Sequence, residues 1–347
     1  MLYYNNKDSA CCTLRMTDGS QDGERMFIGM RARFHLPDFV AKFKFNLVFA
    51  EFLTHCPEYF REGVEIASVY GTFPQSIWNG GRTLDGFCEK PFIKAVIKSY
   101  NDIGIPLRFT FTNPMLEKKH LDDEFCNMVM QLADNGLNEV IVFSPLLEEY
   151  IRKNYPNYKI TSSTCKRITD GDKLIQEVEK DYHIVVIDYD LNHRLDILEK
   201  IPDKKKCELL VNASCQAKCP MRASHYRSIG VQQIAYAEHV KKHRGEPFDN
   251  KKLLLQHPEL KRYTSCPHQN QSLFEILDYP NIIMPDEIWN TYIPMGFEQF
   301  KLEGRTSSIL NMIEHYMIYM AKPECRDEAR FMLMRWLEEN GVLRIEG

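Results

Sequence analysis

The stretch EVIVFSPLLEEYIRKNYPNYKITSST (139–164) contains two short apolar runs with a helical pattern between them. The runs EVIVFSP (139–145) and KITSST (159–164) are typical of buried strands, and PLLEEYIRKNY (145–155) has the spacing of an amphipathic helix. A strand, a helix and a second strand in this order predict two parallel strands joined by a crossover helix.

The same alternation continues in both directions along the chain. Six further runs have the character of strands: FNLVFAEF (45–52), IASVYGT (66–72), PLRFTFTN (106–113), HIVVIDYD (183–190), CELLVNAS (207–214) and EQFKLEGR (298–305). Eight strands separated by helical patterns predict an α/β fold, a closed (β/α)8 TIM-like barrel. An open doubly wound sheet is the alternative, but no GxGxxG or GxxxxGK[ST] motif follows a strand, which disfavours its nucleotide-binding forms.

The barrel pattern also divides the chain. Residues 1–43 show no clear period and are predicted to be an N-terminal lead-in, and the barrel is predicted to occupy residues 44–321. Residues 216–297 are too long for a simple connection, so we expect an insertion between strands seven and eight that carries a helix at 226–243. Residues 322–347 are predicted to form a C-terminal helical tail.

Composition narrows the class of protein. Hydrophobic residues make up 44% of the 347 residues and charged residues 27%, which is typical of a soluble globular protein. The net charge of −4 gives no overall attraction to nucleic acid. Since no long apolar run and no signal-peptide pattern is present, we expect a cytoplasmic protein without membrane insertion. Its 11 cysteines are then expected to be reduced thiols.

The predicted barrel gives a place for chemistry, because active sites on this fold lie at the carboxyl ends of the strands. Polar residues are predicted at all eight strand ends: Glu51, Tyr70, Asn113, Ser144, Thr164, Asp188, Asn212 and Arg305. In the last strand, the alternation directs Phe300 and Leu302 toward the helices. Lys301, Glu303 and Arg305 then face the lumen.

Charged side chains inside a barrel need partners or a ligand. In the third strand Arg108 shares one face with Thr110 and Thr112, so two interpretations stay open: an internal layer of salt bridges, and an anion-binding role for Arg305. Arg82, in the glycine-rich loop GTFPQSIWNGGRT (71–83), is predicted either to contact an anion or to belong to a turn-rich lid.

Four cysteines are predicted near the same mouth. Cys215 and Cys219 follow the seventh strand, Cys165 follows the fifth, and Cys266 lies in the excursion before the last strand. Four thiolates suit a [4Fe–4S] cluster or a structural zinc, and spacing alone does not choose between them. His225 and His268 are alternative ligands. No HExxH or GxSxG motif supports a protease.

The closing segment MGFEQFKLEGRTSSILNMIEHY resembles the signature of the peptidase U32 family. The residues that carry the match are Gly296, Phe297, Lys301, Glu303, Gly304 and Arg305. The order of the earlier strands is similar over residues 44–320. The resemblance implies an iron–sulfur barrel protein that supports oxygen-independent hydroxylation or another redox modification of an aromatic or nucleobase substrate. It also implies a [4Fe–4S] cluster on Cys165, Cys215, Cys219 and Cys266.

Roles for the other predicted site residues follow from that resemblance. Arg305 and Arg108 would position a carboxylate or phosphate, and Arg82 and Lys301 would also bind substrate. Arg305 and Glu303 are expected to be catalytic. Tyr70, Asn113 and Asp188 would orient substrate or move protons.

The expected partners are a small aromatic molecule or RNA, an electron-donor protein and a second subunit in a homo- or heterodimer. The basic segment KKHRGEPFDNKK (241–252) is the local evidence for RNA, and a solvated helix end is its other interpretation. The alternative to an enzyme is a non-catalytic or zinc-stabilised binding protein on the same barrel.

Overall fold

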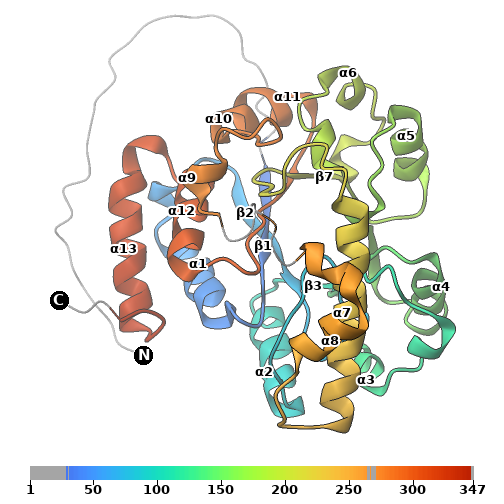
Figure 1. The fold of residues 1–347 in the computed structure, drawn as a ribbon. Coiled ribbons are helices and arrows are strands. Elements are labelled where there is room, and N and C mark those ends of the chain that lie inside the picture. The colour runs from blue at the N-terminus through green and yellow to red at the C-terminus, as the bar shows by residue number, and fades with distance from the viewer. Residues whose placement is uncertain (1–28, 30, 264–265, 267–270, 345–347) are drawn as a thin grey trace, which may run out of the picture. The chain divides into compact units, whose positions relative to one another are not determined.

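Eight parallel strands form a closed barrel in chain order, with β8 pairing back onto β1 (Figure 1). The computed structural model describes residues 29, 31–263, 266 and 271–344. The strands are β1 Ala32–Pro37, β2 Val64–Gly71, β3 Leu107–Phe111, β4 Glu139–Val142, β5 Lys159–Ser162, β6 Ile184–Val186, β7 Cys207–Leu210 and β8 Gln299–Lys301. The predicted α/β barrel is thus confirmed.

Helices follow the strands around the outside of the barrel (Figure 1). The helices are α1 Phe43–His55, α2 Lys90–Asn101, α3 Glu124–Leu132, α4 Pro145–Asn154, α5 Gly171–Glu179, α6 Leu195–Leu198, α7 Arg222–Lys242, α8 Asn250–Gln256, α9 Leu273–Ile276, α10 Pro285–Glu287, α11 Ile293–Met295, α12 Ile309–Met320 and α13 Arg326–Glu339. Short turns of 3₁₀ helix lie between several of them. In the unit 139–164, α4 begins where Ser144 accepts a hydrogen bond from the backbone N–H of Leu147 (3.5 Å) and Pro145 occupies the first turn.

The predicted strand at 45–52 is wrong, because these residues lie in helix α1. The helix buries Phe45, Phe49 and Phe52, which recur at the spacing of one helical face. A run this rich in apolar residues does not by itself separate a buried strand from a buried helix. Glu51, predicted at a strand end, is consequently exposed on α1, away from the barrel interior.

The first barrel strand lies instead within residues 1–43. The segment ARFHLP (32–37) forms β1, so the barrel begins before residue 44. Its alternate residues Ala32, Phe34 and Leu36 are fully buried in the hydrophobic core, whereas His35 points into the lumen. The rest of the predicted lead-in, residues 1–28 and 30, lies outside the described residues.

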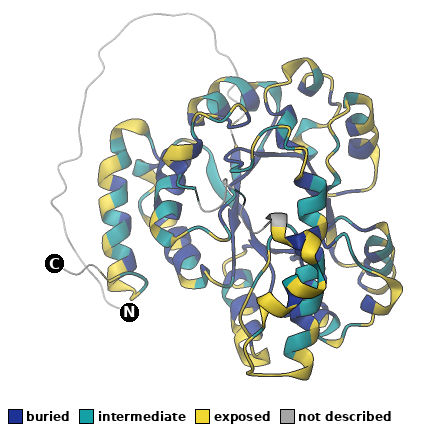
Figure 2. Ribbon diagram, in the orientation of Figure 1, coloured by how far each residue is buried: buried dark blue, intermediate teal, exposed yellow. Residues whose placement is uncertain are grey.

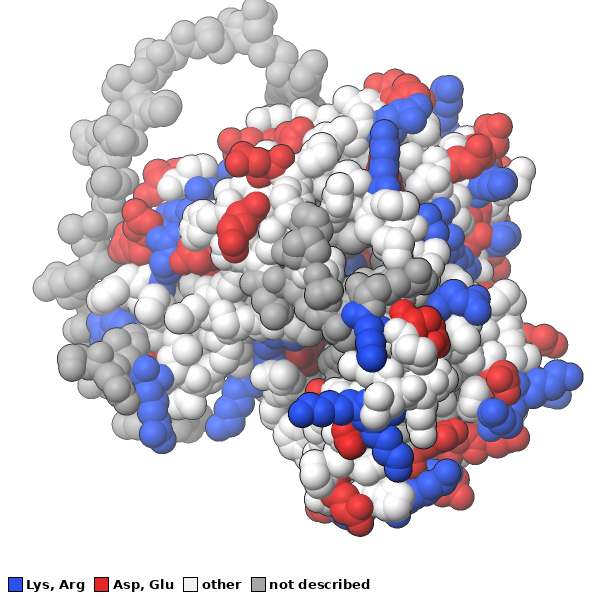
Figure 3. Space-filling view, viewed as in Figure 1, with Lys and Arg blue, Asp and Glu red and all other residues white. Residues whose placement is uncertain are grey.

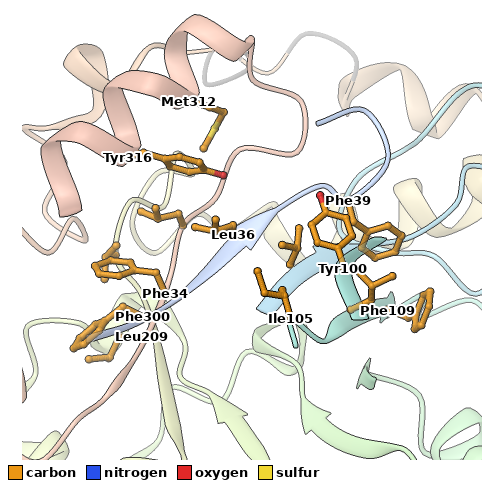
Figure 4. Packing of buried hydrophobic residues seen from close by; sticks show 14 of the residues in the cluster. Phe34, Leu36, Phe39, Tyr100, Ile105, Phe109, Leu209, Phe300, Met312 and Tyr316 are labelled. Atoms are coloured by element: carbon orange, nitrogen blue, oxygen red, sulfur yellow. The ribbon is translucent and has the colours of Figure 1, made fainter. Parts of the chain in front are cut away.

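The hydrophobic core lies between the barrel and its helices. Phe34 of β1 packs on Phe300 of β8, with ring centroids 5.9 Å apart, and Leu209 of β7 lies beside them (Figure 4). The barrel strands are buried, while the exposed residues lie on the outer helices (Figure 2). Phe300 and Leu302 belong to this core, as predicted for residues that face the helices.

A layer of buried charges occupies the barrel interior. The guanidinium of Arg108, which is fully buried, pairs with Glu208 and with Glu139 (3.2 Å), and it donates to Thr161 Oγ1 (3.0 Å). Lys301 Nζ lies 3.5 Å from Glu208 Oε1. These contacts bear out the interpretation of Arg108 as part of an internal salt-bridge layer. Arg108, predicted to bind substrate, does not line the cavity at the mouth, and its charge is already paired within this layer.

Between β7 and β8 the chain makes a helical excursion through α7 to α11. Helix α7 lies against the loops that follow β2 and β3. Gln233 donates to Pro74 O (2.8 Å), and Asn113 donates to Gly230 O (3.2 Å). A Cβ on Gly230 would overlap the side-chain oxygen of Asn113, so glycine permits the close approach. No helix of the described residues has the length and apolar character needed to cross a membrane.

Candidate functional site

A cavity of about 490 Å³ opens at the carboxyl ends of the strands. Eight of the residues predicted for the site line it: Tyr70, Arg82, Cys165, Cys215, Cys266, Lys301, Glu303 and Arg305. Apolar side chains such as Ile141, Leu210 and Ile229 complete the wall. A wider surface depression between α4 and α5 is lined by charges that already pair with one another, such as Lys166 with Glu177 (2.7 Å). The barrel mouth is therefore the candidate site.

Arg305 brings a positive charge that no carboxylate pairs with among the described residues. Its Nη1 donates to Asn79 Oδ1 (3.1 Å) and Thr110 Oγ1 (3.0 Å), and its Nη2 donates to Gly80 O (2.8 Å). These neutral acceptors fix the planar guanidinium without cancelling its charge. Burial lowers the pKa of Arg305, so the cavity holds a charge that an anionic ligand would stabilise.

The loop that positions Arg305 is part of the core. Residues 71–80 are all buried, and the indole N–H of Trp78 donates to His120 O (2.7 Å). Gly80 lies so close to the backbone of Thr112 that an added Cβ would overlap it. The interpretation of 71–83 as a turn-rich lid is therefore wrong for this part of the loop.

Arg82 and Glu303 pair with each other at the rim of the cavity. Glu303 also accepts a hydrogen bond from the backbone N–H of Ser214 (3.2 Å), which joins β8 to the segment after β7. The two side chains are partly exposed. Because this pair is neutral overall and Lys301 pairs with Glu208, the charge at the mouth that has no acidic partner among the described residues is that of Arg305.

Lys301 lies at the cavity wall with its amine over the ring of Tyr70, 4.0 Å from the ring centroid. The hydroxyl of Tyr70 donates to Leu302 O (2.7 Å), so the ring is held in place. Burial lowers the pKa of Lys301 to about 8, although the neighbouring Glu208 opposes the shift. The amine is thus a cation at neutral pH that loses its proton more easily than an exposed lysine.

A histidine that the sequence interpretation missed also lines the cavity. His315, on α12, is 3% exposed, and its Nδ1 lies 2.8 Å from Asn212 Nδ2. Burial lowers the pKa of His315 to about 4. The sequence carries no metal or nucleophile motif around His315, and its position within a buried helix gave no signal of a role.

Two of the buried histidines, His35 and His315, predict how the free energy of unfolding depends on pH. Burial lowers the pKa of His35 to about 3 and that of His315 to about 4, from 6.5 in the unfolded chain. Below about pH 6.5 the unfolded chain takes up protons that the folded chain does not, so the free energy of unfolding falls until about pH 4. We expect a loss of about 2 kcal/mol per histidine by about pH 5, measured by urea denaturation.

The replacement His315→Asn should make that pH dependence shallower, whereas His55→Gln, at an exposed helix end, should not change it. A free energy of unfolding that stays constant between about pH 7 and about pH 5 would contradict the prediction.

Asn113 and Asp188, predicted to act on substrate, do not line the cavity, and both bond to other groups of the protein. Asn113 is fully buried and donates to Ile77 O (2.9 Å), which ties the two loops together. Asp188 pairs with Arg222, whose guanidinium lies 4.3 Å from the ring centroid of Tyr189. Arg222 and Tyr189, not Asp188, reach the cavity.

The four predicted ligand cysteines are free thiols, and three of them, Cys165, Cys215 and Cys266, line the cavity. Cys219 is near enough to act on the pKa of Cys215, which burial raises. In kind, these donors suit a thiolate-bound cluster or zinc. Their positions are a separate matter. Within residues 29, 31–263, 266 and 271–344, no group of three His, Cys, Asp or Glu side chains is placed to hold one metal ion. His268 lies outside these residues.

The basic segment after α7 is partly neutralised by acidic neighbours. Arg244 pairs with Glu89 (2.6 Å), and His243 lies 3.5 Å from Glu246. Basic and acidic side chains are interspersed over the face seen in Figure 3. Such mixed charges are typical of a solvated surface and not of a basic surface that binds the phosphates of RNA.

Comparison with known proteins places the chain among distant relatives. No family model matches the sequence. The chain is 26% identical over 171 residues to an uncharacterized protease of Methanocaldococcus jannaschii; the match covers 47% of this chain, and the chain spans about half the length of that relative. The solved structure of a U32 peptidase is 12% identical, with a TM-score of 0.46 over 83% of this chain and 97% of that one. The chain is thus similar to this protease over about half of its length, and its KLEGR segment (301–305) resembles the U32 signature.

Proposed function

We propose that this chain is a U32-like enzyme that binds an anionic, planar substrate in the cavity at the barrel mouth. The observation that carries the proposal is the guanidinium of Arg305, which is held at the cavity by neutral acceptors only. An anion that enters the cavity would find a fixed, planar donor and the ammonium of Lys301. The rings of Tyr70, Tyr189 and Tyr226 on the same wall favour an aromatic ligand.

We further propose that Cys165, Cys215, Cys219 and Cys266 hold a [4Fe–4S] cluster beside that substrate. Support comes from the U32-like resemblance and from the three thiols that line one cavity. When bound, such a cluster supplies one-electron redox chemistry. In this scheme the reaction is an oxygen-independent hydroxylation or a related redox modification.

The chain's own residues have separate tasks in the proposed site. Arg305 and Lys301 bind the anionic group, and the Arg82–Glu303 pair fixes the rim of the cavity. The amine of Lys301, with its pKa lowered by burial to about 8, can exchange a proton with a bound substrate near neutral pH. The apolar wall excludes water and so strengthens these interactions.

Anaerobic purification tests the cluster. We expect a brown protein with about four irons per chain. Replacing both Cys215 and Cys219 by alanine should abolish the iron, because two of the four ligand atoms are lost. Cys56→Ala, at a cysteine outside the cavity lining, is the matched control and should keep the full iron content.

One outcome would refute the ligand assignment, and another would refute the cluster itself. Unchanged iron in the double variant would show that the ligands lie elsewhere. A colourless protein with one zinc would instead favour a zinc-stabilised binding protein on the same barrel.

A further inference from the structure

Asn212, directly after β7, is held in one orientation by the backbone of Glu303. Its Oδ1 accepts a hydrogen bond from the N–H of Glu303 (2.6 Å), and its Nδ2 donates to the carbonyl O of the same residue (3.0 Å). Exchanging the amide oxygen and nitrogen would place two donors face to face and two acceptors face to face. The positions of Oδ1 and Nδ2 are therefore determined by the backbone.

This orientation determines where His315 carries its proton. The second N–H of Asn212 Nδ2 points to His315 Nδ1 at 2.8 Å, so Nδ1 must accept and cannot carry a proton. The imidazole is then neutral, with its proton on Nε2. Burial favours the same neutral form by lowering the pKa of His315 to about 4.

The Nε2–H of His315 has no acceptor among the described residues. Nε2 is not among the polar atoms that are fully enclosed and lack a partner. His315 lines the cavity. A donor with a fixed direction therefore opens into the site. Arg305 and Lys301 add positive charge to the same wall, so the cavity favours an acceptor that carries negative charge.

We propose that His315 is a substrate-binding residue, which donates the hydrogen bond of its neutral imidazole to an oxygen atom that bears or develops negative charge. Asn212 is its positioning residue, because it fixes the tautomer through the backbone of the KLEGR segment. The inference rests on the proposed function in taking the cavity as the substrate site, but it does not depend on the cluster or on iron.

The tautomer can be observed directly in the full chain labelled with ¹⁵N-histidine. We expect His315 to show one pyridine-type nitrogen, Nδ1, and one pyrrole-type nitrogen, Nε2, unchanged between about pH 8 and about pH 5.5. Asn212→Asp replaces the donor by a carboxylate, so His315 should gain a proton on Nδ1 and show two pyrrole-type nitrogens. Protonation of wild-type His315 in that pH range, or the opposite tautomer, would overturn the proposal.

Binding of 4-nitrophenolate, a planar oxyanion used as the probe, tests the donor itself. His315→Phe keeps an aromatic ring but removes the N–H, and we expect the probe to bind about tenfold more weakly. His315→Gln keeps an N–H and should restore most of the affinity. Equal affinity in all three proteins, or no binding to the wild type at millimolar concentration, would overturn the proposal. Since neither measurement involves iron, a failed cluster and a failed donor are distinguished.

Discussion

Replacing Glu208 with glutamine is expected to lower the free energy of unfolding by about 3–5 kcal/mol. Glu208 is fully buried, and it is the shared partner of Arg108, Lys301 and His35 in the barrel interior. Burial alone would raise its pKa, but the surrounding cations lower the pKa of Glu208 to about 2. The neutral amide would leave buried positive charge without its main counterion.

Urea denaturation of the variant, compared with that of Glu199→Gln at an exposed position, measures the loss. The double replacement Arg108→Met and Glu208→Leu should recover much of it, because the charge and its partner leave together. A loss below about 1 kcal/mol for Glu208→Gln would mean that the layer is not the ion-pair network described, since exposed pairs contribute amounts of that size.

Replacing Gly304 with alanine is expected to cost about 3 kcal/mol and to weaken the binding of anions at the mouth. Gly304 has φ +152°, a conformation that side-chain-bearing residues rarely adopt, and an added Cβ would overlap the sulfur of Met312. Since Gly304 separates Glu303 from Arg305, a shift of the backbone that relieves the overlap would displace these two side chains. Thermal denaturation and calorimetric titration with inorganic phosphate would measure the two effects.

Gly136→Ala is the control for the backbone conformation. Gly136 also has positive φ, +76°, but an added Cβ there would meet nothing within 4 Å. Its replacement should cost about 1 kcal/mol and leave anion binding unchanged. If both variants lose the same stability, the contact with Met312 has no role in the packing of the KLEGR segment.

The sequence predicted the barrel because most strands are short apolar runs between helical patterns. Strand β1, ARFHLP, was missed because its lumen-facing residues Arg33 and His35 are polar, which breaks the apolar run. Helix α1 was taken for a strand because nearly every residue of 45–52 is apolar. The two errors compensate, so the count of eight strands was right although one of the strands was misplaced.

For the site, the KLEGR segment was informative because alternation along a strand determines which side chains face the lumen. The alternation does not show how far along the barrel axis a residue lies. Arg108 was therefore predicted to bind substrate at the mouth. Asn113 was predicted correctly at a strand end, but its hydrogen bonds to Ile77 and Gly230 could only be seen in three dimensions. His315 depends on Asn212, about a hundred residues away.

The buried ionic layer also determines how the cavity communicates with solvent. Arg108 and Glu208 are fully buried and His35 is 2% exposed, so the side chains of this layer have almost no contact with solvent. Lys301 contacts this layer and also lines the cavity, so it can be reached from the mouth. A group bound at the rim, beside Arg82 and Glu303, would block access to Lys301. It would have to leave before the next molecule could enter the cavity.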